Sequence, residues 1–455
     1  MSKEEISTIS EQRNQVFHGD GVELDSPCSI GGGIVHVSDA LAEEAVSAFQ
    51  AYDGSVSFFV PASGSGSRMF KVLNEYLKSS THSKESREFF DRIDDFAFVN
   101  KLPLRVREKI GGTEESSIAA YILSEEGMGY NTLPKGLIPF HRDGSSVLNP
   151  FQTQYRQLSE LIKNKGVIHF TVQGKFQAAI EKSISEVSKS HVELEFSQQS
   201  PLTDAFCFDK DEKPILEAGE YLRRPAGHGA LLDNLNAVDS DLILIKNIDN
   251  IQPTGKDVDS KLYCKVLGGF LLNFKKELLA LSKDFNTAGL IDLNEKYQFL
   301  KSDLVESITL EDINGFLIRP TRVCGMVKNE GEPGGGPFWV KEKNGVSKQI
   351  VELSQIDASP EQKSIVTGSS HFNPVFIAVS SKDAFGEKLD LRDFVDESKC
   401  MTVVKPHKGK SVYYRELPGL WNGSMANWNT IFIEIPSTTF SPVKSVLNLL
   451  RPPHI

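Results

Sequence analysis

The sequence has no long hydrophobic run and few cysteines. No stretch reaches the roughly 18 apolar residues that indicate a membrane-spanning helix, and the start, MSKEEISTISEQRNQ, lacks the apolar core of a signal peptide. We therefore expect no membrane partner and a cytoplasmic address. The five cysteines lie far apart and form no Cys-x-x-Cys pair. This spacing argues against a disulfide framework or a zinc site and favours small buried side chains.

Positive charge is also scarce. The 455 residues include 50 Lys and Arg against 61 Asp and Glu, which gives a formal net charge of −11. This acidic balance argues against a nucleic-acid partner. A small anionic substrate remains compatible with it, because a few cations can reverse the potential within one cleft. The informative cations are those that stand next to glycine.

The composition, 39% hydrophobic and 24% charged, is that of an ordinary globular protein with room for two or three domains. Strand-like runs alternate with helical segments, which favours an α/β layer with a mostly parallel sheet. The strand-like runs are the apolar start of Val56–Met69, Gly166–Val172, His191–Phe196 and Asp241–Ile248. The helical segments are Phe151–Asn164, Phe176–Ser188 and Lys261–Phe285.

Three regions are expected along the chain. Residues 1–50 read as an N-terminal helical extension with a helix across Asp39–Tyr52. Residues 51–315 form the α/β domain and contain a charged, helix-prone insertion at about 70–127. Residues 316–455 are β-rich, either as an added subdomain or as the far half of the same sheet. The strand-like runs there are Gln349–Leu353, Val375–Val379, Met401–Val404 and Thr430–Ile435.

The segment Val56–Met69, VSFFVPASGSGSRM, joins a buried strand to a glycine- and serine-rich loop. Gly64 and Gly66 allow backbone N–H groups to approach an anion, and a helix that begins near Met69 adds its positive end. Arg68 supplies a planar donor fork suited to phosphate. The loop therefore predicts a phosphate site, although a loop of this kind alone also fits an ordinary turn.

Four later segments point to the same chemistry. Lys135, between Pro134 and Gly136, sits on a stiff turn that we expect to be exposed. Gln198 and Gln199 follow a strand and carry the donors and acceptors that a nucleobase edge needs. Taken singly, these segments also fit a solvated lysine and a polar turn.

The other two segments are Gly227-His228-Gly229, before a helical segment, and Asp249, at the end of an apolar strand. The glycines allow close backbone approach, and a carboxylate at a strand end is a good Mg²⁺ ligand. An Asp-Asn turn is the alternative for Asp249. Trp421 and Trp428 are typical of a packed turn.

Together, in this order, the five segments resemble the sugar-nucleotide pyrophosphorylases, and specifically their uridylyltransferase branch, which includes the UDP-N-acetylhexosamine pyrophosphorylases. The resemblance covers roughly residues 56–252. It is carried by Ala62–Arg68, Pro134-Lys135, Gln198/Gln199, Gly227–Gly229 and Asn247–Asn250, with fainter likeness at Gln349–Gln355 and Lys405–Lys410.

The resemblance implies a Rossmann-like nucleotidyltransferase fold (GT-A-like), with a mixed, mostly parallel sheet flanked by helices. It implies that a nucleoside triphosphate, with UTP favoured, and a sugar 1-phosphate give a nucleotide sugar and pyrophosphate, with Mg²⁺ as cofactor. Arg68, Lys135 and Asp249 are then catalytic, and Asp249 holds the metal. The nucleotide-binding residues are Ala62, Ser63, Gly64, Ser65, Gly66, Ser67, Gln198, Gln199, Gly227, His228 and Gly229, and those for the sugar and its phosphate are Asn250, Glu352, Lys405 and Lys410.

The chain also departs from the family pattern, as an outlying branch does. Ser63 replaces the first glycine of the loop, Gln355 replaces an acidic residue of the sugar segment, and 66 residues separate Arg68 from Lys135 in place of a short spacer. An alternative is therefore a nucleotide- or nucleotide-sugar-binding protein that retains the fold without turnover. A P-loop enzyme is excluded because Arg68-Met69 stands where Lys-Ser/Thr is needed, and the dinucleotide fingerprint lacks its third glycine.

Overall fold

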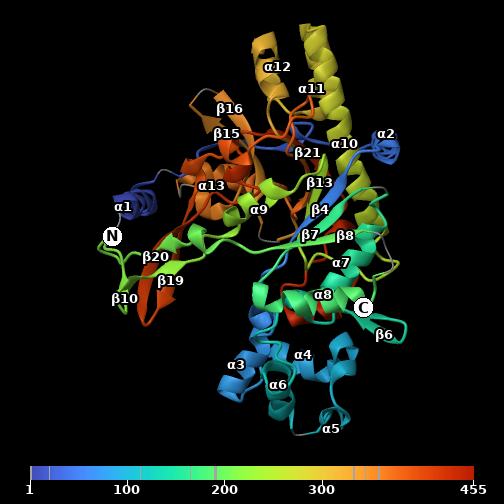
Figure 1. Ribbon diagram of the computed structural model, residues 1–455, viewed down its shortest axis with the longest axis vertical. Coiled ribbons are helices and arrows are strands. Elements are labelled where there is room, and N and C mark those ends of the chain that lie inside the picture. The colour runs from blue at the N-terminus through green and yellow to red at the C-terminus, as the bar shows by residue number, and fades with distance from the viewer. Residues whose placement is uncertain are drawn as a thin grey trace. The chain divides into compact units, whose positions relative to one another are not determined.

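The computed structural model describes residues 3–19, 21–112, 114–163, 165–188, 192–331, 334–343, 345–356 and 359–455. The chain forms two compact units, and each collects three segments that are distant in sequence (Figure 1). Unit 1 comprises Met1–Ser55, Gln199–Ile245 and Cys264–Ser437, and unit 2 comprises Val56–Gln198, Lys246–Tyr263 and Thr438–Ile455. The predicted regions 1–50, 51–315 and 316–455 differ from these units because the prediction assumed continuous segments.

Unit 1 contains a mixed sheet with the strand order β2-β3-β21-β14-β18-β13. β2, β3, β21 and β14 are mutually parallel in this order, whereas β18 and the short β17 pair with β14 in antiparallel fashion. The bounds are β2 (Ser29–Ile30), β3 (Gly33–Val35), β13 (Leu242–Lys246), β14 (Thr321–Lys328), β17 (His371–Phe372), β18 (Phe376–Ser380) and β21 (Asn429–Glu434). The C-terminal strands thus share a sheet with β13, which selects the second of the two alternatives for this region.

Smaller elements complete unit 1. A three-stranded sheet has the order β1-β15-β16, and β19 and β20 form a hairpin. Their bounds are β1 (Leu24–Pro27), β15 (Gly336–Glu342), β16 (Gly345–Val351), β19 (Met401–His407) and β20 (Lys410–Glu416). Unit 1 also contains four strands of two residues each, namely β9 (Ala205–Phe206), β10 (Leu216–Glu217), β11 (Glu220–Tyr221) and β12 (Arg223–Arg224). The helices are α1 (Lys3–His18), α2 (Asp39–Ala51), α9 (Leu232–Ala237), α10 (Val258–Lys283), most of whose residues belong to this unit, α11 (Thr287–Tyr297), α12 (Leu310–Leu317) and α13 (Pro360–Thr367).

The first 50 residues differ from the predicted helical extension. α2 confirms the helix expected across Asp39–Tyr52, and Ser38 caps it by accepting a hydrogen bond from the Leu41 N–H. The segment also contains β1, β2 and β3, and β3 pairs with β21 through Ile34 and Val35. Both residues are buried. These strands are two to four residues long, too short for a hydrophobic period to be visible in the sequence.

Unit 2 has a parallel sheet of order β4-β7-β8, formed by β4 (Val56–Pro61), β7 (Val167–Thr171) and β8 (Glu193–Ser197). The aromatic and β-branched run of β4 is buried from Val56 to Val60, as expected of a parallel strand that is covered on both faces. Helices α7 (Pro150–Ser159) and α8 (Gln177–Ser185) follow the predicted segments, and the hairpin β5 (His141–Asp143) and β6 (Ser146–Leu148) precedes them. His191 and Asn164, at the edges of two predicted elements, lie outside the described residues. The predicted fold class, mixed α/β with a mostly parallel sheet flanked by helices, is confirmed.

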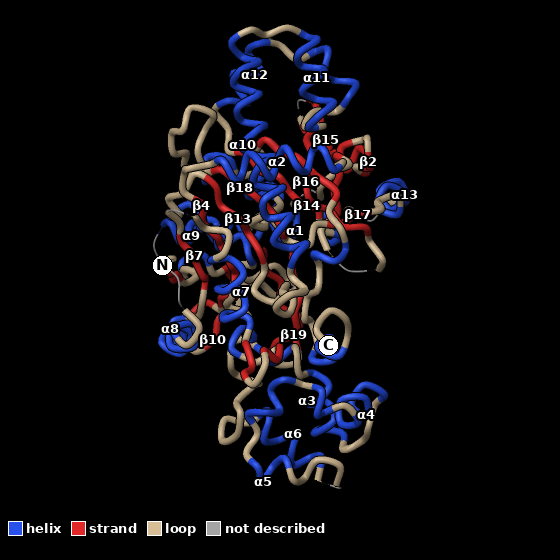
Figure 2. Tube along the Cα trace, turned by 90° about the vertical axis from the view of Figure 1, so that its right-hand side faces the viewer, coloured by secondary structure: helices blue, strands red, loops and turns tan. Residues whose placement is uncertain are grey.

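The insertion predicted at 70–127 is mainly helical in its described part, with turns and loops between the helices. It contains α3 (Lys71–Ser79), α4 (Lys84–Asp91), α5 (Leu104–Arg107) and α6 (Glu115–Leu123), which gather in one group in Figures 1 and 2. Buried aromatic rings form its core, including Phe96, which stacks on both Phe89 and Phe98 with centroids 4.9 and 5.1 Å apart. Leu449 and Leu450, near the end of the chain, pack on the same core. The insertion therefore shares its hydrophobic core with the C-terminal segment of unit 2.

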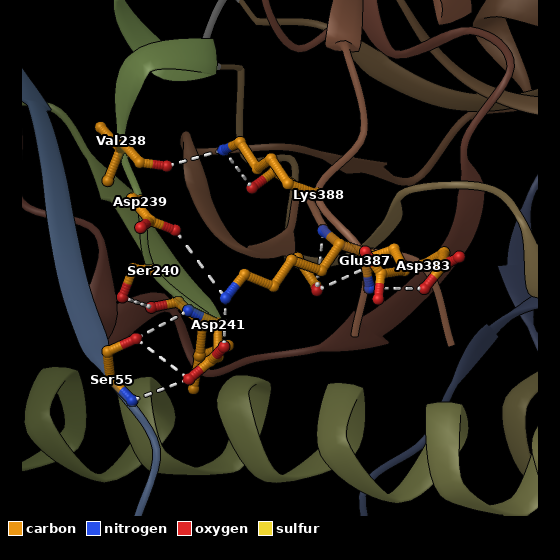
Figure 3. Close-up of polar contacts among 12 residues, drawn as sticks. Ser55, Val238, Asp239, Ser240, Asp241, Asp383, Glu387 and Lys388 are labelled. Atoms are coloured by element: carbon orange, nitrogen blue, oxygen red, sulfur yellow. Dashed lines mark hydrogen bonds and ion pairs between the residues drawn. The ribbon is translucent and has the colours of Figure 1, made fainter. Parts of the chain in front are cut away.

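A polar network holds the start of β13 (Figure 3). Asp241 Oδ2 accepts hydrogen bonds from the N–H and the hydroxyl of Ser55 at 2.9 and 3.0 Å, and Lys382 Nζ lies 2.7 Å from Oδ1. Burial alone would raise the pKa of Asp241, but these hydrogen bonds outweigh it and lower the pKa to about 2. Lys388 Nζ donates to the Val238 carbonyl at 2.8 Å. The network ties β13 to the segment 381–388.

The structure also bears on the cysteines and on membrane-spanning helices. All five cysteines are free thiols, and all except the half-buried Cys400 are buried, as predicted. None of the helices in the described ranges combines the length and the apolar character that crossing a bilayer demands.

In unit 2, two histidines form a buried pair. His141 Nε2 lies 2.7 Å from His454 Nδ1, the rings stack with centroids 5.1 Å apart, and His454 Nε2 lies 3.1 Å from the Ser441 carbonyl. Because a carbonyl only accepts, His454 carries its proton on Nε2 and accepts at Nδ1 from His141. Burial is the main cause that lowers the pKa of His141 to about 3 and that of His454 to about 4. Both imidazoles are therefore neutral in the folded protein.

This pair predicts a loss of stability on mild acidification. The unfolded chain takes up protons at these histidines below pH 6.5, whereas the folded protein does so only near pH 4 and below. The cost at pH 5 relative to pH 7 is about 2 kcal/mol for each histidine. Urea unfolding at the two pH values should show a smaller loss in His141→Gln than in the wild type. Equal losses in both proteins would contradict the buried neutral pair.

Candidate functional site: a glycine-serine loop, Lys135 and Asp249

The loop after β4 presents free backbone donors. The Ala62 N–H closes the strand by donating to the Thr171 carbonyl at 2.9 Å. Within the described residues, the N–H groups of Ser63, Gly64 and Ser65 donate no hydrogen bond. The loop is thus able to bind an acceptor-rich anion with these three amides. The Gly66 N–H, by contrast, is occupied by the Leu133 carbonyl at 2.8 Å.

Arg68 ends the 3-10 turn Gly66–Arg68, and its side chain is exposed. It makes no ion pair or side-chain hydrogen bond to another described residue. Arg68 therefore adds an uncommitted cation beside the loop amides. The helix predicted near Met69 begins two residues later, as α3 at Lys71.

The loop pairs directly with the Pro134-Lys135 segment. The Lys135 N–H donates to the Gly64 carbonyl at 3.0 Å, and Ser65 and Pro134 form an antiparallel bridge. The helical insertion thus leaves the loop and returns to it, so the 66 intervening residues do not separate Arg68 from Lys135 in space. Gly136 is needed for this return, since a Cβ there would lie 2.5 Å from the Phe151 ring.

Lys135 and Asp249 form an ion pair. Lys135 Nζ lies 2.5 Å from Asp249 Oδ2, and the two side chains are only 14% and 20% exposed. The expectation of an exposed Lys135 is therefore wrong, because the Gly64 contact directs the lysine toward the turn that follows β13. That turn is held by the Asn250 N–H, which donates to the Asn247 carbonyl, and by Gln154 Nε2, which donates to the same oxygen.

Asn250 is buried and has a structural contact at each end of its amide. Its Nδ2 donates to the Thr439 carbonyl at 3.2 Å, and its Oδ1 accepts from the Ser441 N–H at 2.8 Å. These bonds attach the C-terminal segment to the Asp249 turn. The predicted sugar contact of Asn250 stays a prediction.

Sequence reasoning missed Gln173 as part of the loop. Its Nε2 donates to the Ser63 carbonyl at 2.7 Å, which fixes the loop next to the end of β7. A glutamine directly after a strand was the signal that singled out Gln198, and the same signal is present here in Thr171–Gly174. Gln198 is exposed and lies beside Gly174, where a Cβ would come within 2.5 Å of its amide.

The predicted residues of unit 1 form a second group. Gly227 has φ +76°, and a Cβ there would lie 2.5 Å from Glu416 Oε2, so both the conformation and the space require glycine. A Cβ on Gly229 would lie 2.2 Å from the Pro418 carbonyl. The Gly227–Gly229 turn therefore packs closely on residues 416–418. Gln199, half-buried, begins the same chain segment of this unit.

His228 is held in one tautomer at the centre of this group. Its Nδ1 accepts a hydrogen bond from the Leu420 N–H at 2.9 Å, and its ring stacks on Trp421 with centroids 4.1 Å apart. When the imidazole is neutral, its proton is therefore on Nε2, which lies 3.6 Å from Glu352 Oε1. The structure thus brings together His228 and Glu352 from two predicted segments, and it gives Trp421 a role in packing the histidine.

Lys405 and Lys410 lie on the β19–β20 hairpin, and both are exposed. Lys405 Nζ lies 5.4 Å from the centre of the Tyr414 ring. His407, between them, accepts from Arg224 at Nδ1 and contacts Glu217 at 2.6 Å. The predicted phosphate contacts of the two lysines stay predictions.

The loop geometry gives a prediction on stability. A Cβ on Gly66 would lie 2.5 Å from the Tyr130 carbonyl, whereas nothing lies within 4 Å of one on Gly64. Gly66→Ala should therefore lower the free energy of unfolding by about 1 to 3 kcal/mol, and Gly64→Ala, in the same loop, should leave it nearly unchanged. Urea unfolding of the two variants measures the difference, and equal effects would contradict the described loop.

No curated protein matches the sequence. The solved structures that are similar to it include a uridine diphosphate N-acetylglucosamine pyrophosphorylase from Trypanosoma brucei, which is 13% identical with a TM-score of 0.49 over 98% of this chain and 76% of that one. A UDP-glucose phosphorylase from Trypanosoma brucei is also 13% identical, with a TM-score of 0.44 over 95% of this chain and 69% of that one.

A family model matches residues 1–455 over their whole length. The chain belongs to the family described as Domain of unknown function (DUF4301).

Proposed function

We propose that the protein is a nucleotidyltransferase that joins a sugar 1-phosphate to a nucleoside triphosphate, with UTP preferred. A phosphate oxygen of the sugar 1-phosphate attacks the α-phosphorus, the bond from that phosphorus to the bridging oxygen breaks, and pyrophosphate leaves in line. The products are a nucleotide sugar and pyrophosphate. Positioning and charge stabilisation are sufficient for such a transfer, and no covalent intermediate is needed.

One observation supports the proposal above all others. Lys135 contacts the glycine-serine loop through its backbone and Asp249 through its ammonium, although the three elements are far apart in sequence. An ammonium held 2.5 Å from a carboxylate, on a residue whose backbone bonds to the loop with the free amides, suits the neutralisation of a triphosphate's charge. A surface lysine on a polar turn has no physical reason to be held in this way.

In this proposal the loop binds the triphosphate. The N–H groups of Ser63, Gly64 and Ser65 donate to phosphate oxygens, and Arg68 stabilises the charge of the leaving pyrophosphate. Lys135 leaves Asp249 and donates to the transferred phosphate, where negative charge builds up. Gly66 keeps the loop close to Leu133 and donates nothing to the substrate, since its N–H is already used.

Asp249 fits the requirements of Mg²⁺. This ion keeps several waters and is bound by one or two carboxylates together with substrate phosphates, so a lone carboxylate beside the loop is an adequate protein ligand. In the described part of the chain there is no cluster of three or more His, Cys, Asp or Glu that could hold a metal by itself. When bound, the ion supplies charge neutralisation between the phosphates of the two substrates. Asp249 also orients Lys135 before the substrates bind.

The remaining contacts of the proposal rest on the resemblance. Glu352 hydrogen-bonds sugar hydroxyls, Gln198, Gln199 and Gly227 contact the base, and Lys405 or Lys410 meets the sugar phosphate. The 3.6 Å distance from Glu352 to His228 supports a shared role for these two segments.

Pyrophosphate release tests the reaction. Purified protein with Mg²⁺, UTP and a panel of sugar 1-phosphates should release pyrophosphate with at least one sugar. Asp249→Asn should abolish the release, whereas Asp91→Asn, an exposed aspartate of the insertion, should leave it unchanged. No release with any sugar, while UTP and Mg²⁺ still raise the melting temperature, would instead establish a nucleotide-binding protein without turnover. No release and no UTP binding would contradict both functions.

Lys135 gives a kinetic prediction. Lys135→Ala should lower kcat on the order of 100-fold or more, as the loss of a preorganised electrostatic contact does. The matched control is Lys71→Ala, since Lys71 belongs to the same unit but is 76% exposed. An unchanged kcat in folded Lys135→Ala would remove Lys135 from the mechanism.

A further inference from the structure

Unit 1 contains a cavity that lies apart from the proposed nucleotide and sugar contacts. None of those residues lines it. Its volume is about 410 Å³, and it is enclosed by α12, the segment after α11, β16 and the segment 426–430. Figures 1 and 2 show α11 and α12 at the same end of this unit as β15 and β16. A volume of this size is in the range of small-ligand sites, which are roughly 300 to 1,000 Å³.

Apolar and aromatic side chains make up much of the lining. They include Leu304, Ile308, Phe316, Val346, Trp339 and Trp428. The Trp428 side chain is buried, and its Nε1–H has no hydrogen-bond partner in the described structure. The cavity thus has a mixed lining, in which these apolar and aromatic side chains alternate with polar and charged ones.

Arg319 places a cation in the same lining without a matching anion. Its guanidinium is half-buried, lies 5.3 Å from the centre of the Phe316 ring, and makes no hydrogen bond or ion pair to any described side chain. Burial lowers its pKa, and Asp312 only partly opposes this effect. Asp312 also lines the cavity, but its Oδ2 accepts from both the N–H and the hydroxyl of Thr309, at 2.8 and 2.7 Å.

Two further cations are buried nearby. Lys348 lines the cavity and is buried, and its ammonium donates only to the carbonyls of Gly33 and Gln298. Arg322 is fully buried and donates to Thr430 Oγ1 and to the Trp421 carbonyl, at 2.8 and 2.7 Å. None of these acceptors is a carboxylate. The surroundings of the cavity therefore carry a surplus of positive charge, which an anion would compensate.

We propose that this cavity is a second ligand site, which binds a small anion with an apolar body, such as a carboxylate or phosphate monoester on an aromatic ring. The anionic group pairs with the Arg319 guanidinium, and the apolar body lies among Phe316, Val346 and the two tryptophans. The site is independent of the proposed nucleotidyl transfer, because it shares no residue with the loop, Lys135 or Asp249.

Tryptophan fluorescence tests the site directly, since two of the three tryptophans of the chain line the cavity. Phenyl phosphate is the probe, and phenol is its neutral counterpart. Phenyl phosphate should change the emission of the wild-type protein with a dissociation constant below about 1 mM, whereas phenol should not. No change with phenyl phosphate up to about ten times that concentration, or an equal change with phenol, would overturn the proposal.

Three variants locate the binding. Arg319→Gln should weaken the binding of phenyl phosphate at least tenfold. Arg105→Gln, which removes an exposed arginine of unit 2, should leave the binding unchanged. Val346→Phe fills the cavity and retains every charge, so it should also weaken the binding of phenyl phosphate at least tenfold. Melting curves without probe show whether each variant is folded. Full-strength binding in folded Val346→Phe, or equal weakening in Arg105→Gln, would contradict a site in this cavity.

Discussion

The contact between Lys135 and Asp249 is the interaction on which the candidate site depends. It joins the loop after β4 to the turn after β13, and its two side chains are largely withdrawn from water. A pair in such surroundings is costly to desolvate, so its gain in stability is small, and its geometric consequence is the larger one. It fixes the ammonium of a residue whose backbone N–H bonds to the Gly64 carbonyl of the loop that carries the free amides.

The helical insertion is compatible with this arrangement because it packs into one hydrophobic core together with residues on both sides of the site. Phe89, Phe96 and Phe98 pack on one another and on the C-terminal residues Leu449 and Leu450. The chain leaves the loop at Gly66 and returns at Leu133, and a hydrogen bond between these two residues closes the insertion. The insertion can therefore be long without any change in the distance from Gly64 to Lys135.

Much of this could be predicted from local patterns, and the rest could not. The aromatic run of β4, the strand that ends before Asp249 and the helical character of 70–127 each follow from a hydrophobic period or a composition that a short window shows. The burial of Lys135 and the tautomer of His228 depend on partners 114 and 192 residues away. No sequence pattern singled out Arg319, because the absence of an anionic partner can be recognised only when the positions of the surrounding side chains are known. The predicted contacts of Glu352, Lys405 and Lys410 remain to be tested.

A crystal structure of the protein with UTP and Mg²⁺ tests the central claim most directly. The account predicts that phosphate oxygens of UTP lie within hydrogen-bond distance of the Ser63, Gly64 and Ser65 amides, and that Lys135 Nζ has moved from Asp249 to the α-phosphate. A triphosphate bound away from this loop, or bound there with Lys135 still paired to Asp249, would contradict it.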